Sequence, residues 1–412
     1  MLDTAKINFA APEIKANPHP LYARLRDEAR VARVRLWGVG GWMLTRYDDV
    51  VAAMKDERLA SDRRNAPTGH RPFTEKVLNR MTGPLNRSML ASDEPDHGRL
   101  RGLVHQAFTA RRVEQMRDRI GALTEELLNK VAARREMDIV RDLALPLPST
   151  IIAEMLGLPA ADRERFHHWS DAMLTLSSMN VLAIAGVAPT VLAFRRYIRE
   201  QVRLRRRRPS DDLISGLLEA EESGQKLSED EILAMIFLLL IAGHETTVNL
   251  IGNGMLALME HPAERERLRA APGLMPSAIE ELLRYESPLE LANPRWTRCA
   301  VTLAGATIPA GEPVIMNLVA ANRDPRQFER PDVLELARNP NRHVAFGAGS
   351  HYCLGAFLAR LEAQIVFTTL LERFPELRLA VPRDRLRWRN SFVLRGLESL
   401  PVTWRQPAAA AT

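Results

Sequence analysis

Apolar residues recur at three- and four-residue intervals along most of this chain, and that spacing predicts a mainly α-helical protein. Residues 62–92 differ, because they are polar, contain Pro67, Pro72 and Pro84, and lack a clear period, which predicts a long loop. A helix also opens near Asp93. The remaining shorter helices are expected over residues 21–28, 48–56, 112–133, 145–156, 160–176, 190–206, 277–285 and 356–374.

The longest predicted helix runs from about Asp230 to Glu260. Ser228, followed three residues later by Glu231, is the sequence of a capping box at its start. The first half of this helix is apolar on all sides, so it should be buried. Its longest apolar run, Ile232 to Ala242, is too short to span a bilayer.

Three segments show the alternation expected of strands. Residues 31–46 alternate around Gly38, Gly40 and Gly41 and predict a β-hairpin. Residues 301–314 and 388–404 predict further short strands. Because no linker-like stretch interrupts these patterns, all of residues 1–412 are interpreted as a single domain, mainly α with a small β region.

The composition is that of an ordinary soluble globular protein, with 46% hydrophobic and 26% charged residues. The net charge of +6 suits docking of an acidic partner and is a weak indication of nucleic-acid binding. The basic run Arg205 to Arg208 is interpreted structurally, because a helix C-terminus favours cations and Pro209 follows it. Two cysteines fit a reducing compartment, and the charged N-terminus indicates no signal peptide or membrane anchor, so a cytoplasmic protein is expected.

One of those cysteines, Cys353, lies in a glycine-rich stretch just before the helix that starts near Ala356. A helix N-terminus stabilises an anion, and glycines allow a backbone to approach a flat ligand closely, so the position suits a thiolate. Cys353 could be a buried structural cysteine, a nucleophile with His351 as its base, or a metal ligand. Zinc is unlikely to be the metal, since Cys299 is the only other cysteine, whereas a haem iron needs one protein thiolate.

A second unusual stretch interrupts the central helix at residues 242–247. A glycine, an acid and two hydroxyls inside an apolar helix cost stability, and such exceptions indicate function. The structural alternative is a kink at which the threonines bond back to helix carbonyls. Both interpretations can hold, because a bulge would open room for a ligand and a water.

The pattern Phe-Gly-x-Gly-x-His-x-Cys-x-Gly, from Phe346 to Gly355, resembles the haem-binding signature of the cytochrome P450 monooxygenases. Residues 242–247 resemble that family's Ala/Gly-Gly-x-Asp/Glu-Thr motif. Glu281 to Arg284 resembles its Glu-x-x-Arg pair, and Asp93 to Arg101 its helix along the haem edge. The four motifs occur in the family's order, and the resemblance extends from Asn17 to Trp404.

The resemblance implies the cytochrome P450 fold, a triangular prism with haem b between the central helix and the helix after Cys353. It also implies a haem-thiolate monooxygenase that inserts one oxygen atom of dioxygen into a hydrophobic organic substrate, by hydroxylation or epoxidation. Electrons would come from NAD(P)H through a ferredoxin and a ferredoxin reductase, since no flavin or iron–sulfur segment is present. Arg99, Arg111 and Arg112 would steer the ferredoxin to the cysteine side.

The resemblance also implies roles for individual residues. Cys353 would be the iron ligand, Thr246 would stabilise bound dioxygen, and Glu245 would help to deliver protons. His244 receives no role. The expected haem-binding residues, with His351 as a propionate partner rather than a base, are His97, Arg101, Arg295, His351, Phe346, Gly347, Gly355 and Ala242.

Further roles concern the pocket and the support of the cysteine loop. Arg298 is an alternative to Arg295 as the propionate partner. Glu281 and Arg284 would form a buried ion pair that braces the cysteine loop, although the arginine that often joins them near Val333 is missing. The expected substrate-pocket residues are Leu289, Leu291, Ala292, Phe392 and Val393.

Two other classes of protein compete with this interpretation. A peroxide-driven haem enzyme or a gas sensor would not insert oxygen from dioxygen, and the acid–threonine pair argues against the peroxide route. A helical protein that binds nucleic acid through its arginine run would be colourless. The substrate stays open, because the pocket segments 81–90, 173–182 and 289–294 are largely apolar and suit terpenes, steroids, macrolides or fatty acids. Glu290 and Arg87 are candidate polar anchors for a substrate, although a solvated role is favoured for each.

Overall fold

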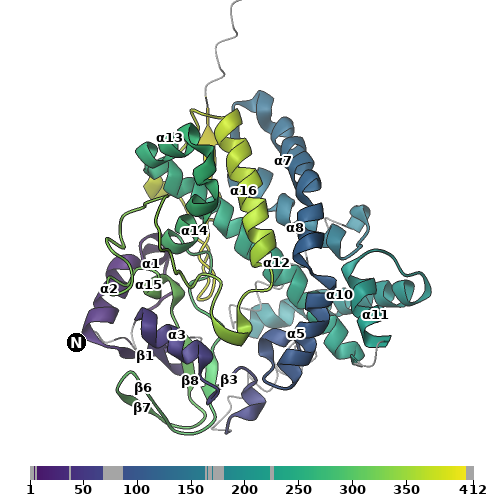
Figure 1. The fold of residues 1–412 in the computed structure, drawn as a ribbon, viewed down its shortest axis with the longest axis vertical. Helices are drawn as coiled ribbons and strands as arrows, with labels where there is room; N and C mark the ends of the chain where they lie inside the picture. Colours follow the sequence, from purple (N-terminus) through teal and green to yellow (C-terminus); the bar gives the residue numbers. More distant parts are fainter. Residues whose placement is uncertain are drawn as a thin grey trace, which may run out of the picture.

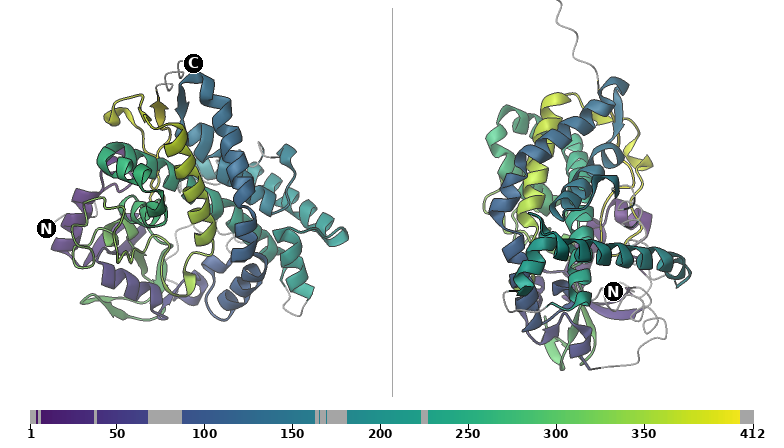
Figure 2. Two further views of the ribbon diagram at one scale, coloured as in Figure 1. Left: turned by 45° about the horizontal axis from the view of Figure 1, so that its top comes forward. Right: turned by 90° about the vertical axis from the view of Figure 1, so that its right-hand side faces the viewer.

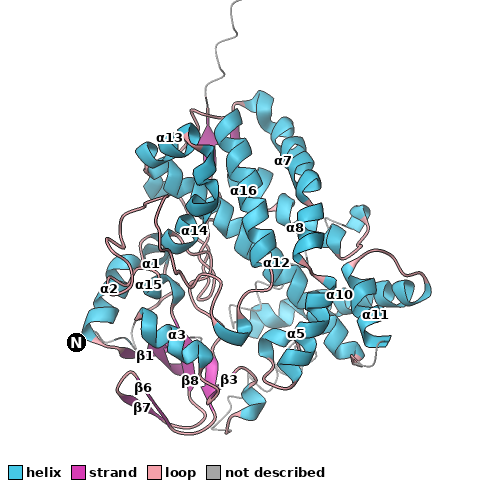
Figure 3. Cartoon of the chain, in the orientation of Figure 1, coloured by secondary structure: helices cyan, strands magenta, loops and turns pink. Residues whose placement is uncertain are grey.

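The computed structural model describes residues 7–36, 39–67, 87–162, 181–222 and 227–404, together with Thr4, Arg165 and Trp169. Their ribbon has a triangular outline in which helices predominate, with most strands along one edge (Figures 1 and 3). The helices are α1 (Pro12–Ala16), α2 (His19–Glu28), α3 (Tyr47–Lys55), α5 (Asp96–Ala107), α6 (Ala110–Gln115), α7 (Arg117–Val131), α8 (Pro146–Met155), α10 (Val181–Arg207), α11 (Leu213–Glu222), α12 (Glu229–Glu260), α13 (Pro262–Ala270), α14 (Met275–Tyr285), α15 (Leu318–Ala321) and α16 (Ala356–Arg373).

The helix α12 is the predicted central helix. The Ser228 hydroxyl accepts the Glu231 N–H at 3.3 Å, and a Glu231 carboxylate oxygen accepts the Ser228 N–H at 2.7 Å, which confirms the capping box. Figure 2 shows α12 passing through the body of the molecule, and it contacts α8, α14 and α16. Its length and apolar composition would suffice to cross a membrane, but most of its apolar window is buried by these neighbours.

The strands build two sheets and a separate hairpin. The larger sheet has the order β1-β2-β8-β5-β3, and the predicted hairpin is its β1–β2 pair, in register from Val31 opposite Leu44. A three-stranded sheet has the order β4-β10-β9, and β6 pairs with β7. The strands are β1 (Val31–Leu36), β2 (Val39–Leu44), β3 (Leu59–Ala60), β4 (Glu136–Asp138), β5 (Arg295–Thr297), β6 (Val301–Leu303), β7 (Ala306–Ile308), β8 (Pro313–Met316), β9 (Arg378–Leu379) and β10 (Pro401–Thr403).

Some predicted boundaries differ from the structure. The helix expected over 112–133 is divided at Met116 into α6 and α7, and α10 begins at Val181 rather than near residue 190 because Pro189 is tolerated inside it. Of the expected loop, residues 68–86 lie outside the described residues, as does most of the expected helix 160–176. Arg205 binds Asp212 and the Gly157 carbonyl, a structural use of the basic run.

The predicted Glu281–Arg284 pair is completely buried on α14, and two hydrogen bonds of 2.7 and 2.8 Å join it. The third member thought to be missing is present as Arg338, whose Nε lies 3.1 and 3.2 Å from the Glu281 oxygens. Arg338 lies five residues after Val333, near which the arginine was expected. In the turn between these two residues, the Arg338 N–H donates to the Glu335 carbonyl at 2.9 Å. The network therefore contains one buried carboxylate between two guanidinium groups.

Replacing Arg338 with Met is expected to lower the free energy of unfolding by about 3–5 kcal/mol, because it removes one partner of a buried ionic network. Arg330→Met is the matched control. Arg330 pairs with Glu335 at 3.3 Å, but its side chain is 61% exposed, so its loss should cost less than about 1 kcal/mol. Urea unfolding followed by circular dichroism measures both; equal losses would contradict the buried network.

Candidate active site

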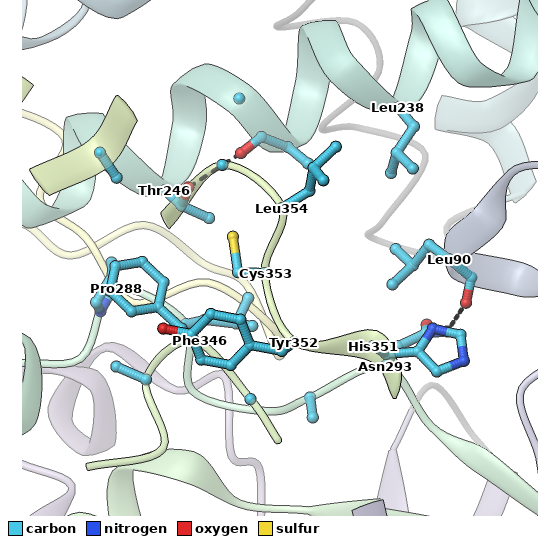
Figure 4. A pocket seen from close by; sticks show the side chains of 18 of the residues that line it. Leu90, Leu238, Thr246, Pro288, Asn293, Phe346, His351, Tyr352, Cys353 and Leu354 are labelled. Carbon is cyan, nitrogen blue, oxygen red and sulfur yellow. Dashed lines mark hydrogen bonds between the residues drawn. The ribbon is translucent and has the colours of Figure 1, made fainter. Parts of the chain in front are cut away.

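A cavity of about 450 Å³ lies between α12 and the loop that carries Cys353. Its walls come from segments far apart in sequence, among them the start of α5, the stretch 288–295 and the stretch 391–394. Figure 4 shows the Cys353 sulfur directed into the space below α12, with Thr246 on that helix across from it. The structure therefore brings together the two motifs that sequence reasoning singled out.

The cysteine loop is shaped by glycines with left-handed backbone conformations. Gly347 has φ 74° and Gly349 has φ 73°, values that residues with a side chain rarely adopt. The Cys353 N–H donates to the Phe346 carbonyl at 2.9 Å, which closes the loop before α16 begins at Ala356. This tight loop places the Cys353 sulfur in the wall of the cavity, just before the start of α16.

The charge state of Cys353 differs from the sequence expectation. The helix N-terminus was expected to lower its pKa, but burial raises the pKa of the thiol, and the Gly355 N–H and the more distant charges of Arg101 and Arg360 oppose this only partly. Removal from water outweighs the helix end here.

The opposite wall is the polar turn of α12. Ala242, Gly243, Glu245 and Thr246 line the cavity, and the Thr246 hydroxyl donates to the Ala242 carbonyl at 3.0 Å. The threonine thus bonds back along the helix as the structural alternative predicted. The expected bulge is absent from this turn, because α12 is continuous through it.

Glu245 is buried, and its carboxylate lies between two basic side chains. Arg389 donates to it at 3.2 Å, and the His244 ring nitrogen Nε2 is also 3.2 Å away. His244 had received no role, and Arg389 had not been noticed. Arg389 lies 144 residues further along the chain, and no spacing pattern could have linked it to Glu245.

Basic side chains gather at one end of the cavity. His97, Arg101, Arg295 and His351 all line it, and the two imidazole rings are 4.1 Å apart. Arg101 donates to the Tyr352 carbonyl at 2.8 Å, so it also holds the cysteine loop. Burial, together with the charges of Arg295, His97 and Arg101, lowers the pKa of His351 to about 3. The cluster has positive charge that an anionic ligand would offset.

The structure distinguishes the two candidate arginines. Arg295 is 9% exposed and lines the cavity, whereas Arg298 is paired with Asp93 at 2.8 Å and does not. Burial lowers the pKa of the Arg295 guanidinium, with Asp93 opposing. Arg295, at the start of β5, is therefore the arginine available to a ligand in the cavity.

Only some of the expected pocket residues reach the cavity. Leu289, Ala292 and Val393 line it. The predictions for Leu291 and Phe392 were wrong, because Leu291 is buried in the hydrophobic cluster near the N-terminus and Phe392 packs against that cluster.

Glu290 was also misjudged. It is completely buried and bonded to Lys15 and Tyr22, so it anchors α1 and α2 behind the cavity wall instead of being solvated. Arg87 is exposed, as expected. Residues 81–86 and 173–180 of the expected pocket segments lie outside the described residues.

The residues present fit the haem that the sequence resemblance implies. The buried Nε2 of His97 has no hydrogen-bond partner among the described residues, although its Nδ1 is bonded to Glu94. Together with Arg101, Arg295 and His351, this free nitrogen suits a pair of carboxylates. The described residues contain no group of three or more His, Cys, Asp or Glu side chains that could hold a metal ion.

Known proteins resemble this chain over nearly its full length. The family model described as Cytochrome P450 matches residues 6–271 and 273–395. "Polyketide biosynthesis cytochrome P450 PksS" of Bacillus subtilis is 44% identical over 95% of this chain and 96% of its own length. "Cytochrome P450 107B1" of Saccharopolyspora erythraea is 47% identical over 93% of this chain and 94% of its own length. The solved structure of myxobacterial cytochrome P450 CYP267B1, in complex with myristic acid, is 44% identical, has a TM-score of 0.91, and matches over 97% of this chain and 99% of that one.

Proposed function

Because the chain belongs to the cytochrome P450 family of haem-iron oxidoreductases, we propose that it is a haem-thiolate monooxygenase. It inserts one oxygen atom of dioxygen into a hydrophobic organic substrate, by hydroxylation or epoxidation. The observation that carries this proposal is the placement of the Cys353 sulfur across one cavity from Thr246 and Glu245. All of residues 1–412 act as one domain.

The proposed cofactor is haem b. Cys353 would be its protein ligand, and Ala242 on α12, which lines the same cavity, would contact it. His97, Arg101, Arg295 and His351 bind its carboxylates, a role supported by their convergence at one end of the cavity. When bound, the haem supplies the iron that activates dioxygen, and a thiolate ligand favours cleavage of the oxygen–oxygen bond.

Phe346, Gly347 and Gly355 complete the surface that the cofactor contacts. All three line the cavity. The left-handed conformation of Gly347 keeps the backbone close to the ligand plane. Within the loop, the Tyr352 N–H donates to the Gly349 carbonyl and the Cys353 N–H donates to the Phe346 carbonyl.

Thr246 and Glu245 supply the protons. The Thr246 side chain lines the cavity, and its hydroxyl donates to the Ala242 carbonyl until a ligand in the cavity accepts the proton instead. When Glu245 leaves Arg389, its carboxylate takes a proton from a water molecule and releases it to Thr246 Oγ1, which gives its own proton to the ligand. A proton therefore reaches the cavity through side chains.

The substrate is a long or bulky apolar molecule. Leu289, Ala292 and Val393 supply the apolar side chains expected beside such a molecule, and Leu238 and Leu90 also line the cavity. Support comes from the name of the Bacillus relative, which refers to polyketide biosynthesis, and from the myristic acid bound to the myxobacterial relative. A screen of hydrophobic compounds for a shift of the haem spin state identifies the class.

Electrons come from NAD(P)H through a ferredoxin reductase and a ferredoxin, in the cytoplasm. The ferredoxin docks on the face that bears the cysteine loop, where Tyr352 is 40% and Phe357 is 65% exposed. Of the three arginines expected to steer the ferredoxin, Arg111 is exposed. Arg99 forms an ion pair with Glu231, and Arg112 forms one with Asp211. The apolar contribution to docking is therefore larger than the sequence suggested.

The reaction class is tested by comparing two sources of oxidising equivalents. With ferredoxin, reductase and NADPH, a compound that shifts the spin state should be oxidised, and hydrogen peroxide alone should support at most a small fraction of that rate. Equal or faster turnover with peroxide alone would favour the peroxide-driven alternative.

Replacing Cys353 with Ala should abolish the red-shifted absorption of the reduced carbonyl complex, because the haem loses its thiolate ligand. Cys299→Ala is the matched control, since Cys299 is exposed and does not line the cavity; its spectrum should be unchanged. A red-shifted band that survives in the Cys353 variant would exclude this residue as the ligand.

The variant Thr246→Ala should uncouple NADPH oxidation from product formation, with peroxide released in place of product. The fraction of NADPH that yields product should fall at least several-fold, because removal of the hydroxyl disrupts the protonation of activated oxygen. Thr247→Ala, on the neighbouring position of α12, controls for loss of a hydroxyl from this helix. Coupling equal to that of the unmodified protein would contradict the role of Thr246.

A further inference from the structure

A second ionic cluster lies behind the cysteine loop, separate from the Glu281 network. Glu280, next to Glu281 on α14, accepts two hydrogen bonds from Arg360 of α16, at 2.6 and 2.8 Å. His343 Nε2 lies 3.0 Å from the same carboxylate. Although burial opposes it, Arg360 and His343 lower the pKa of Glu280 to about 2, so the carboxylate stays charged. Three segments of the chain thus meet at one anion.

The guanidinium held by Glu280 lies against the cysteine loop. Its central carbon is 4.4 Å from the centre of the Phe346 ring, a distance typical of a cation–π contact. The rings of His343 and Tyr352 lie 6.0 and 6.2 Å from the Phe346 ring. Phe346 is therefore enclosed by side chains that come from both sides of the loop.

Phe346 in turn holds Cys353 through the backbone, because its carbonyl accepts the Cys353 N–H at 2.9 Å. A continuous series of contacts consequently runs from Glu280 through Arg360 and Phe346 to the cysteine.

We propose that Glu280, His343 and Arg360 form a clamp that fixes Phe346 and the cysteine loop, and that the charge of Arg360 raises the reduction potential of the iron held by Cys353. This inference rests on the proposed function, in which Cys353 is the iron ligand. Arg360 is a positioning and tuning residue in this account, because it does not touch the cofactor. Adding an electron to the site adds negative charge, and a nearby cation stabilises the reduced state.

Removing each charge of the clamp separately distinguishes electrostatic tuning from a simple loss of packing. Arg360→Met removes the cation and should lower the reduction potential. Glu280→Gln removes an anion from the same cluster and should raise it. Simple loosening of the packing between α14 and α16 would instead shift both variants in the same direction.

The matched control is Arg373→Met on the same helix. Arg373 binds Glu125 and, at 2.8 Å, Asn129. Its side chain is 25% exposed, close to the 31% of Arg360. It lies thirteen residues further along α16, roughly 20 Å away at 1.5 Å per residue. Its removal therefore costs an ion pair of similar exposure without changing the charge beside the loop.

The experiment is a spectroelectrochemical titration of the haem-loaded protein and its three variants. Arg360→Met should reduce the equilibrium constant for reduction on the order of tenfold, which is about 59 mV for one electron. Glu280→Gln should shift the potential in the opposite direction, and Arg373→Met should leave it unchanged. Arg360 and Glu280 variants with shifts of the same sign, or no larger than that of the control, would overturn the tuning role.

A second measurement tests the clamp itself. The red-shifted band of the reduced carbonyl complex should be lost several-fold faster on warming in both clamp variants than in Arg373→Met. Equal rates in all three variants would overturn the clamp. If the unmodified protein itself lacks that band, the proposed function is wrong. This outcome differs from a failure of the clamp, because it is seen before any variant is compared.

Discussion

The position of one sulfur atom relative to one helical turn is the constraint on which the rest of this structure depends. Cys353 must face the polar turn of α12 across an enclosed apolar cavity. Its loop is short and rich in glycine, so it has little intrinsic stability, and α12 carries polar groups that cost stability in a buried helix. Both elements therefore need support from the surrounding fold.

Part of that support is ionic and comes from behind the cavity. Two adjacent acids on α14 bind different partners: Glu281 holds the turn that contains Arg338, and Glu280 holds Arg360 against the cysteine loop. A third acid, the completely buried Glu290, ties the cavity wall to the N-terminal helices. Buried charges are costly unless paired, so the completely buried carboxylates of Glu281 and Glu290 specify which segments meet there.

The features that sequence reasoning predicted well are those that neighbouring residues determine. The capping box at Ser228, the hairpin from Val31 and the glycine loop before Ala356 all depend on local geometry. The four motifs also indicated which segments would meet at the cavity. The family comparisons confirm the fold, and the roles of individual residues stay proposals.

The features that were missed depend on contacts between distant parts of the chain. Arg389 reaches Glu245 across 144 positions, and Arg338 reaches Glu281 through a turn whose path the sequence does not reveal. Leu291 and Phe392 pack in the hydrophobic cluster near the N-terminus, whose members come from segments far apart in the sequence. Burial also reversed the expected effect of the helix end on the pKa of Cys353.

Oxygen-isotope labelling tests the central claim most directly. The haem-loaded protein would turn over a compound that shifts its spin state, with ferredoxin, reductase and NADPH, under ¹⁸O-labelled dioxygen in ordinary water. The account predicts a product that carries one ¹⁸O atom, as detected by mass spectrometry. A product without the label, or one that takes up oxygen from labelled water instead, would contradict it.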